Sequence, residues 1–263
     1  MTTFLVDSQS GACDSLWTDK YDIPAIVDLD KYLFIEELDE FETPIQEKIG
    51  HEKIIFYSGC YDQIVLHQAL TVGILNEAQY SIQAQNAVAL GNSAFSYVEI
   101  ILQTWEPYPV NCLHAHGLIA GGSGGNHAIH AYVETTYNTK LAVEEACKLD
   151  PKSSEPVTYF HHNASGNYTS ENCDKIGVQN INNIYSKAEE LILSMQSGER
   201  GGLMDKVKYS GYTTAPSPEA PPINISQVLE QHHMAKMRTK QLRVRRNPKT
   251  SSKEKIVVKP LAL

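Results

Sequence analysis

The residues with the clearest chemical potential are lysines and arginines clustered near the C-terminal end of the chain. Residues 231–263 hold ten of the 22 lysines and arginines and a single acidic residue, Glu254. Clustered cations attract phosphate backbones and release counterions, which makes binding dependent on salt, and arginines suit bidentate phosphate contacts. The candidate nucleic-acid or subunit-binding residues are Lys236, Arg238, Lys240, Arg243, Arg245, Arg246 and Lys249.

This basic tail permits three interpretations. It could contact RNA or DNA phosphates, dock on an acidic surface of a neighbouring copy, or serve as a solvated, solubilising segment. It contains no aromatic residue, so stacking on the bases of a single strand is not indicated. The composition leaves all three interpretations open, and the first two are compatible within one assembly.

Four histidines form the second candidate site. His114 and His116 are two residues apart, so on a strand both would point to the same side. His127 and His130 are three residues apart at an expected helix start. Together they could offer imidazole ligands to Zn²⁺ or another transition metal. No standard zinc spacing occurs, and Glu134 is a weak candidate base, so this metal site is kept only as an alternative and no cofactor is expected.

The sequence shows no arrangement typical of a catalytic nucleophile. The glycine loop from Gly121 to Gly125 lacks the lysine of a P-loop and is interpreted as a flexible connector. No G-x-S-x-G motif occurs, and Cys112 lies near His114 only in sequence, which does not make a catalytic dyad. We therefore predict no catalytic residue and no enzymatic activity.

Composition narrows the class of protein further. The chain has 263 residues and a net charge of −9, although its tail is positive, so the remainder is strongly acidic. The apolar runs are too short to cross a bilayer, and we expect no signal peptide. Five widely spaced cysteines without a C-x-x-C pair favour free thiols in a reducing compartment. We predict a cytoplasmic or virion location and no membrane partner.

The apolar periodicity predicts a mainly α-helical body with few short strands. Residues 28–47 fit an acidic amphipathic helix, and residues 61–105 fit two helices broken near Gly91 and Asn92. From Gln63 to Val98 the only charged side chain is Glu77, which indicates either a deep core or a face covered by another subunit. Further helices are expected over residues 127–149 and 178–195, and a short strand over residues 157–160.

Four segments follow from these patterns. Residues 1–27 are predicted to be an irregular N-terminal arm, and residues 28–196 an acidic helical body. Residues 197–223 are rich in glycine and proline and are predicted to be an extended linker. Residues 224–263 are predicted to form a basic C-terminal helix and tail.

The favoured function is a self-assembling structural protein, such as a viral coat or nucleocapsid-like subunit. The acidic body, the basic tail and the nearly uncharged segment all suit contacts between copies. The expected partners are other copies of the chain and, through the tail, RNA or DNA. The alternatives are a metal-dependent enzyme built on His114, His116, His127 and His130, and an intracellular adaptor that recruits a partner through its tail.

Overall fold

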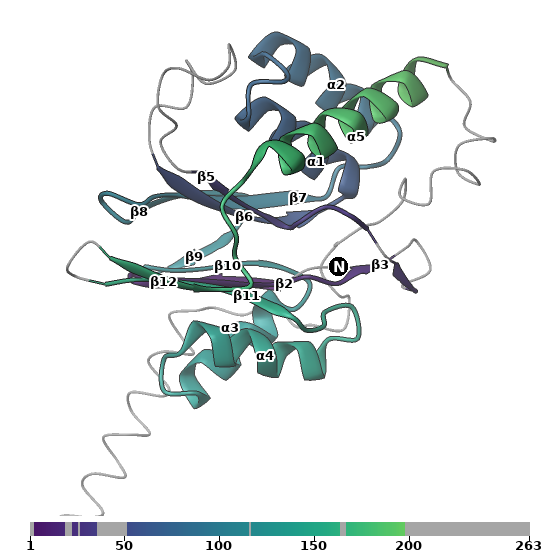
Figure 1. Ribbon diagram of the computed structural model, residues 1–263. Helices are drawn as coiled ribbons and strands as arrows, with labels where there is room; N and C mark the ends of the chain where they lie inside the picture. The colour runs from purple at the N-terminus through teal and green to yellow at the C-terminus, as the bar shows by residue number, and fades with distance from the viewer. Residues whose placement is uncertain are drawn as a thin grey trace, which may run out of the picture. The chain divides into compact units, whose positions relative to one another are not determined.

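The computed structural model describes residues 3–18, 23–25, 27–35, 52–115, 117–163 and 167–197. They form four layers, in which two stacked antiparallel sheets lie between two layers of helices (Figure 1).

One sheet has six strands in the order β12-β11-β2-β1-β10-β9. The first strands of the chain lie at its centre, because β1 pairs with both β2 and β10. The strands are β1 (Thr3–Val6), β2 (Ser10–Asp14), β9 (Leu113–Ala115), β10 (Leu118–Gly122), β11 (Val157–His162) and β12 (Tyr168–Glu171).

The second large sheet has four strands in the order β5-β6-β7-β8, and a two-stranded sheet joins β3 to β4. The apolar run that contains Ile54, Ile55 and Phe56 forms the buried strand β6. The strands are β3 (Trp17–Thr18), β4 (Pro24–Ala25), β5 (Tyr32–Ile35), β6 (Lys53–Gly59), β7 (Phe95–Ile101) and β8 (Glu106–Val110).

Helices cover the outer face of each large sheet. The four-stranded sheet carries α1 (Tyr61–Thr71), α2 (Glu77–Ala89) and α5 (Val178–Ser197), and the six-stranded sheet carries α3 (Gly125–Glu134) and α4 (Thr139–Leu149) (Figure 1). Side-chain caps fix the first turn of two of these helices. Asn76 and Gln79 form a reciprocal capping box at the start of α2, and the Asn138 side chain caps α4.

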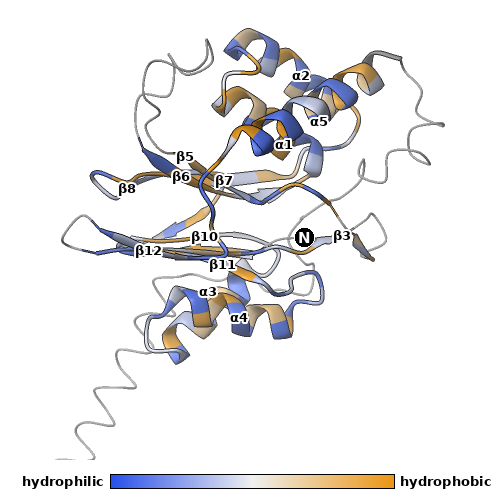
Figure 2. Cartoon of the chain, in the orientation of Figure 1, coloured by the Kyte–Doolittle hydropathy of each residue, from blue (hydrophilic) through white to orange (hydrophobic). Residues whose placement is uncertain are grey.

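Two apolar cores hold the layers together (Figure 2). Between the sheets, Phe4, Phe34, Phe56 and Phe160 are fully or almost fully buried. The other core lies between the four-stranded sheet and its helices, where Ile184, Ala188 and Leu191 of α5 belong to the same cluster as residues of α1 and β6, and α5 packs on α1. Burial of this apolar surface is the main stabilising contribution to such a fold.

The prediction of a mainly α-helical protein is wrong, because the described residues form three antiparallel sheets as well as helices. The predicted irregular N-terminal arm is also wrong from Thr3 onward. Residues 3–14 form two strands in the middle of a sheet, and all but the polar turn at residues 7–9 are buried. Short strands buried on both faces show no alternation of polar and apolar residues, which is why the pattern was missed.

Two predicted helices have different boundaries. The uncharged segment breaks after Thr71 as well as near Gly91, where α2 ends, and from Phe95 it continues as strand β7. The helix predicted over residues 127–149 is two helices, α3 and α4, separated by Thr136 and Tyr137 with positive φ. The strand at residues 157–160 and the helix at residues 178–195 are confirmed as β11 and α5.

Several predicted elements fall partly or wholly on residues outside the described ranges. Phe34, assigned to an acidic helix over residues 28–47, lies on β5, whereas residues 36–51 lie outside the described residues. The predicted linker and basic tail also lie outside them. Within the described part, no helix is both long and apolar enough to cross a membrane.

Candidate functional site

The histidines predicted as metal ligands do not form a recognisable metal site. His114 lies exposed on β9, while His127 and His130 lie on α3, and His116 falls outside the described residues. Among the residues that the structure describes, no group of three His, Cys, Asp or Glu side chains is placed to hold a metal ion. The tail residues from Lys236 to Lys249 likewise fall outside, so their role stays a prediction.

The glycine loop has a packing role that its sequence did not reveal. A Cβ atom added to Gly124 would lie 1.9 Å from Thr3 Oγ1, and one added to Gly121 would lie 2.3 Å from Phe4 Cζ. Both glycines therefore allow β10 and the start of α3 to approach β1 closely. The loop predicted to be a flexible connector brings α3 against the first residues of the chain.

Those first residues are held by a tight hairpin. Asp7 Oδ1 accepts hydrogen bonds from the backbone N–H groups of Gln9 and Ser10, which forms the turn between β1 and β2. The register of the hairpin pairs Phe4 with Cys13. At the open end of the hairpin the Thr3 N–H donates to Asp14 Oδ1 at 2.7 Å, so the start of β1 is tied to a buried carboxylate.

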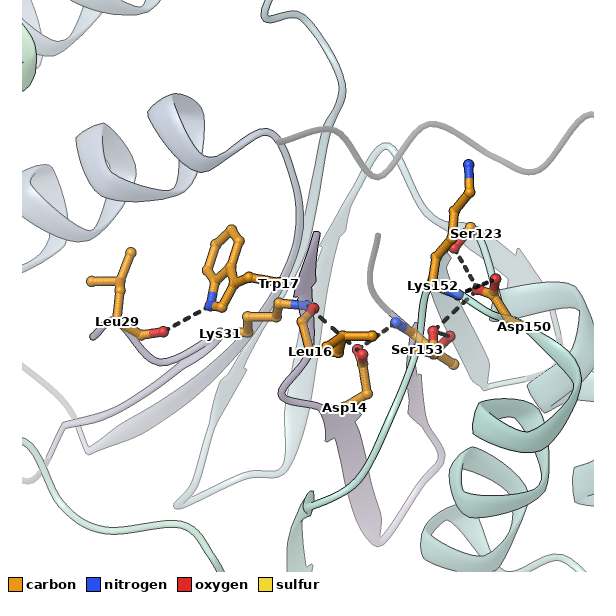
Figure 3. Close-up of polar contacts among 10 residues, drawn as sticks. Asp14, Leu16, Trp17, Leu29, Lys31, Ser123, Asp150, Lys152 and Ser153 are labelled. Carbon is orange, nitrogen blue, oxygen red and sulfur yellow. Dashed lines mark hydrogen bonds and ion pairs between the residues drawn. The ribbon is translucent and has the colours of Figure 1, made fainter. Parts of the chain in front are cut away.

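Asp14 is one half of a buried ion pair (Figure 3). Its Oδ2 atom lies 3.7 Å from Lys31 Nζ, and both side chains are at most 1% exposed. Lys31 immediately precedes β5 and reaches across from the other sheet. Its Nζ donates to the Leu16 carbonyl oxygen and lies 4.9 Å from the centroid of a Trp17 ring. The Trp17 indole N–H donates in turn to the Leu29 carbonyl oxygen at 2.9 Å.

Burial changes the proton affinity of both charged groups. Loss of hydration lowers the pKa of Lys31, and the neighbouring Asp14 carboxylate opposes that change. Burial raises the pKa of Asp14, which Lys31 and the Thr3 N–H oppose. A lysine with a lowered pKa can accept and release a proton nearer neutral pH than a solvated lysine.

A second set of hydrogen-bonded polar residues reaches the start of β1 from the end of α4 (Figure 3). The buried carboxylate of Asp150, at the end of α4, accepts hydrogen bonds from Ser123 Oγ at 2.6 Å and from Ser153 Oγ at 3.1 Å. The Ser153 hydroxyl is also 2.7 Å from Thr3 Oγ1. Two sets of polar residues therefore meet at Thr3. The Lys31–Asp14 pair reaches its backbone nitrogen, and the Asp150–Ser153 pair reaches its hydroxyl.

These six residues were not identified as candidates from the sequence. Thr3, Asp14, Lys31, Ser123, Asp150 and Ser153 are separated by up to 150 positions. One signal was present, since Asp14 and Lys31 each sit beside apolar residues that form buried strands. A charged side chain beside buried apolar residues is rarely buried without a partner of opposite charge. The positions of Asp14 and Lys31 therefore indicate an ion pair.

Comparisons with known proteins leave the family open. No family model and no curated protein matches the sequence. Solved structures that resemble this chain include Thiobacillus denitrificans BPH and the same protein in complex with epoxomicin, at 15% and 13% sequence identity. Each match covers 60% of this chain and 96% of the other, with a TM-score of 0.38. A likeness this weak supports no assignment, so function is inferred from the residues of this chain.

Proposed function

We propose that the protein hydrolyses amide or ester bonds, with Thr2 as its nucleophile once Thr2 is the first residue of the mature chain. One observation carries this proposal: the Lys31–Asp14 ion pair and the hydrogen-bonded Asp150–Ser153 pair both contact Thr3, the residue next to Thr2 in the sequence. A threonine hydroxyl beside its own free α-amine is an established nucleophile and base combination.

Thr3 has the contacts of a positioning residue. Its hydroxyl is hydrogen-bonded to Ser153, its N–H is bonded to Asp14, and it is fully buried between β2 and β10. A hydroxyl held in this way inside a sheet has little access to a substrate. Thr2 itself lies outside the described residues, and in the sequence it is joined directly to Thr3.

The proposed reaction has two steps. The Thr2 hydroxyl attacks the substrate carbonyl while its proton passes to the free α-amine, and collapse of the tetrahedral intermediate transfers that proton to the leaving amine or alcohol. The product of this step is an ester between the acyl group and Thr2. Water, deprotonated by the α-amine, then hydrolyses the ester and restores the hydroxyl.

Lys31 and Asp150 have distinct roles in this scheme. In this scheme Lys31, whose side-chain nitrogen is held beside the Asp14 carboxylate, supplies the positive charge that stabilises the negative charge developing on the reacting oxygen. Asp14 holds Lys31 in place. Asp150 orients the Ser123 and Ser153 hydroxyls, so that Ser153 fixes the start of β1. This proposal differs from the sequence-based expectation of no activity, and the following experiment distinguishes the two.

The direct test is to trap the acyl intermediate. The full chain is incubated with p-nitrophenyl acetate, and we expect a burst of p-nitrophenolate and an acetyl group on the peptide that begins at Thr2, located by mass spectrometry. The matched control carries an uncleaved tag before Thr2, which converts the α-amine into an amide and should remove the burst. Equal bursts from the two proteins, or acetylation confined to surface lysines, would refute the proposal.

A second candidate function, self-assembly, is favoured by the surface of α2. No charged residue occurs between Glu77 and Glu99, yet Ala87 is the only buried residue of this helix. Ile82 and Val88 are 58% and 51% exposed. Exposed helix faces normally carry charge, whereas the cores of subunit interfaces are depleted in it. We propose that this α2 face contacts another copy, which is compatible with catalysis.

Light scattering after size-exclusion chromatography tests this contact. The full chain is expected to elute as an oligomer, and Ile82→Glu should shift it toward the monomer because a charge enters the interface. The matched control, Val178→Glu, changes an equally apolar residue that is 75% exposed on α5 and should leave the oligomer intact. A monomeric wild-type chain at high concentration and low salt would exclude self-assembly through α2.

A further inference from the structure

A small pocket lies where the segment leading into β5 meets α1 and α5. Its volume is about 50 Å³, and Leu33, Phe34, Ile176 and Ile184 contribute apolar surface to it. Acidic and amide side chains complete the lining, namely Asp28, Asp30, Asp174, Gln68, Asn180 and Asn183. The pocket thus combines apolar surface with oxygen-bearing groups.

Within the described part of the chain, no ion pair compensates the three carboxylates of this pocket. Among the ion pairs within the described part of the chain, none involves Asp28, Asp30 or Asp174. Burial raises the pKa of Asp30, and the nearby charges of Asp28 and Asp174 raise it further. The adjacent Lys175 directs its ammonium toward the rings of Phe34 and Tyr168, at 5.7 Å from each centroid. A bound positive charge would relieve the repulsion among the carboxylates.

Gln68 supplies an independent indication of a ligand. It is 1% exposed, and its Nε2 donates to the Asp30 carbonyl oxygen at 2.8 Å. This bond fixes the orientation of the amide, and its Oε1 atom is buried without a hydrogen-bond partner among the described residues. A buried acceptor without a donor is costly and rare in native proteins, so the pocket needs a hydrogen-bond donor as well as positive charge.

We propose that this pocket binds a primary alkylammonium group, such as the end of a lysine side chain. The ammonium offers three donors on a compact head, and its methylene stem is apolar, which matches Gln68 Oε1, the carboxylates and the apolar wall. A volume of about 50 Å³ accommodates only a few groups of the size of water, each of which needs roughly 10–15 Å³.

The pocket is less suited to a divalent metal ion. Calcium binds six to eight oxygen ligands at short distances, whereas about half of this lining is apolar side chains. No three carboxylates in the described part of the chain converge closely enough to hold a metal. The alkylammonium group is therefore the occupant that both the charge and the shape favour.

Titration of the full chain with N-acetyl-lysine methylamide tests the proposal. Binding is followed through the side-chain NH₂ signals of Gln68 by NMR, and we expect saturable, millimolar binding. The uncharged analogue N-acetyl-norleucine methylamide should not bind. Equal binding of the two compounds, no saturation with the lysine compound, or its displacement by submillimolar CaCl₂ would each overturn the proposal.

Variants locate the binding to this pocket. Asp30→Asn combined with Asp174→Asn should weaken lysine binding by about tenfold or more, because charge-assisted hydrogen bonds are lost. The control pair, Glu189→Gln with Glu190→Gln, makes the same change in net charge on exposed positions of α5. Equal weakening by the two pairs would show only a general charge effect and would contradict a specific site. Melting temperatures of both variants check that the fold is intact.

The alkylammonium group could be supplied by another molecule or by the chain's own tail. Replacing the lysines beyond residue 231 with glutamine in the full chain separates these sources. Tighter binding of the probe by that variant would identify the tail as a competitor, whereas unchanged binding would identify an external amine. The lysines concerned are Lys236, Lys240, Lys249, Lys253, Lys255 and Lys259.

Discussion

Thr2→Ala is expected to lower kcat/KM for ester and amide hydrolysis by about 10⁴-fold or more, as loss of the nucleophile does in other hydrolases that form an acyl intermediate. The loss arises because Thr2 supplies the nucleophilic hydroxyl of the proposed reaction. Thr3, the adjacent candidate, is buried and bonded to Ser153 and Asp14. The measurement is steady-state hydrolysis of p-nitrophenyl acetate and of a fluorogenic amide.

Two further variants show whether this loss is chemical or structural. Thr2→Ser keeps a hydroxyl beside the α-amine and should retain activity within about tenfold of wild type. Thr169→Ala removes a hydroxyl from an exposed position of β12 and should have no effect. If Thr2→Ala remains as active as Thr169→Ala, Thr2 is not the nucleophile. If Thr2→Ser is as inactive as Thr2→Ala, the requirement is for more than a hydroxyl.

Lys31→Met is expected to destabilise the protein by roughly 3–5 kcal/mol, because it leaves the Asp14 carboxylate buried without its cation. Both side chains are at most 1% exposed, so solvent cannot replace the lost partner. The methionine fills similar space against Trp17, which limits any contribution from a cavity. Urea denaturation of the full chain measures the change in the free energy of unfolding.

The double variant Asp14→Asn with Lys31→Met separates stability from catalysis. Removing both charges eliminates the unpaired carboxylate, and the oxygen of the introduced amide can still accept the hydrogen bond from the Thr3 N–H, so most of the lost stability should return. Activity should not return, because the proposed reaction needs the positive charge of Lys31. A double variant no more stable than Lys31→Met alone would contradict the ion-pair explanation, and an active one would remove Lys31 from the mechanism.

Some elements could be predicted because their signal is local. The apolar residues from Val178 to Met195 recur with helical spacing, and α5 buries Ile184, Ala188 and Leu191 against the core as that spacing requires. Strand β11 confirms the short strand that the sequence predicts over residues 157–160. The pattern failed where strands are buried on both faces, as in β1 and β2, since their composition resembles that of an irregular or helical segment.

The uncharged segment from Gln63 to Val98 shows how one local pattern can hide two environments. The alternatives drawn from it were a deep core or a covered surface. In the structure α1 is almost wholly buried, whereas α2 is mostly exposed. The absence of charge is compatible with both environments, so only the placement of each helix on the sheet distinguishes them.

The sequence by itself determined the contrast between an acidic chain and its basic tail, the lack of a standard metal or phosphate-binding motif, and helix α5. These features depend on composition or on the spacing of residues close together in the chain. Only the tertiary structure decided that Lys31 meets Asp14 and that Ser153 meets Thr3, across 150 positions in the second case. Those contacts depend on strand register and on the stacking of two sheets, which are set by burial over the whole fold.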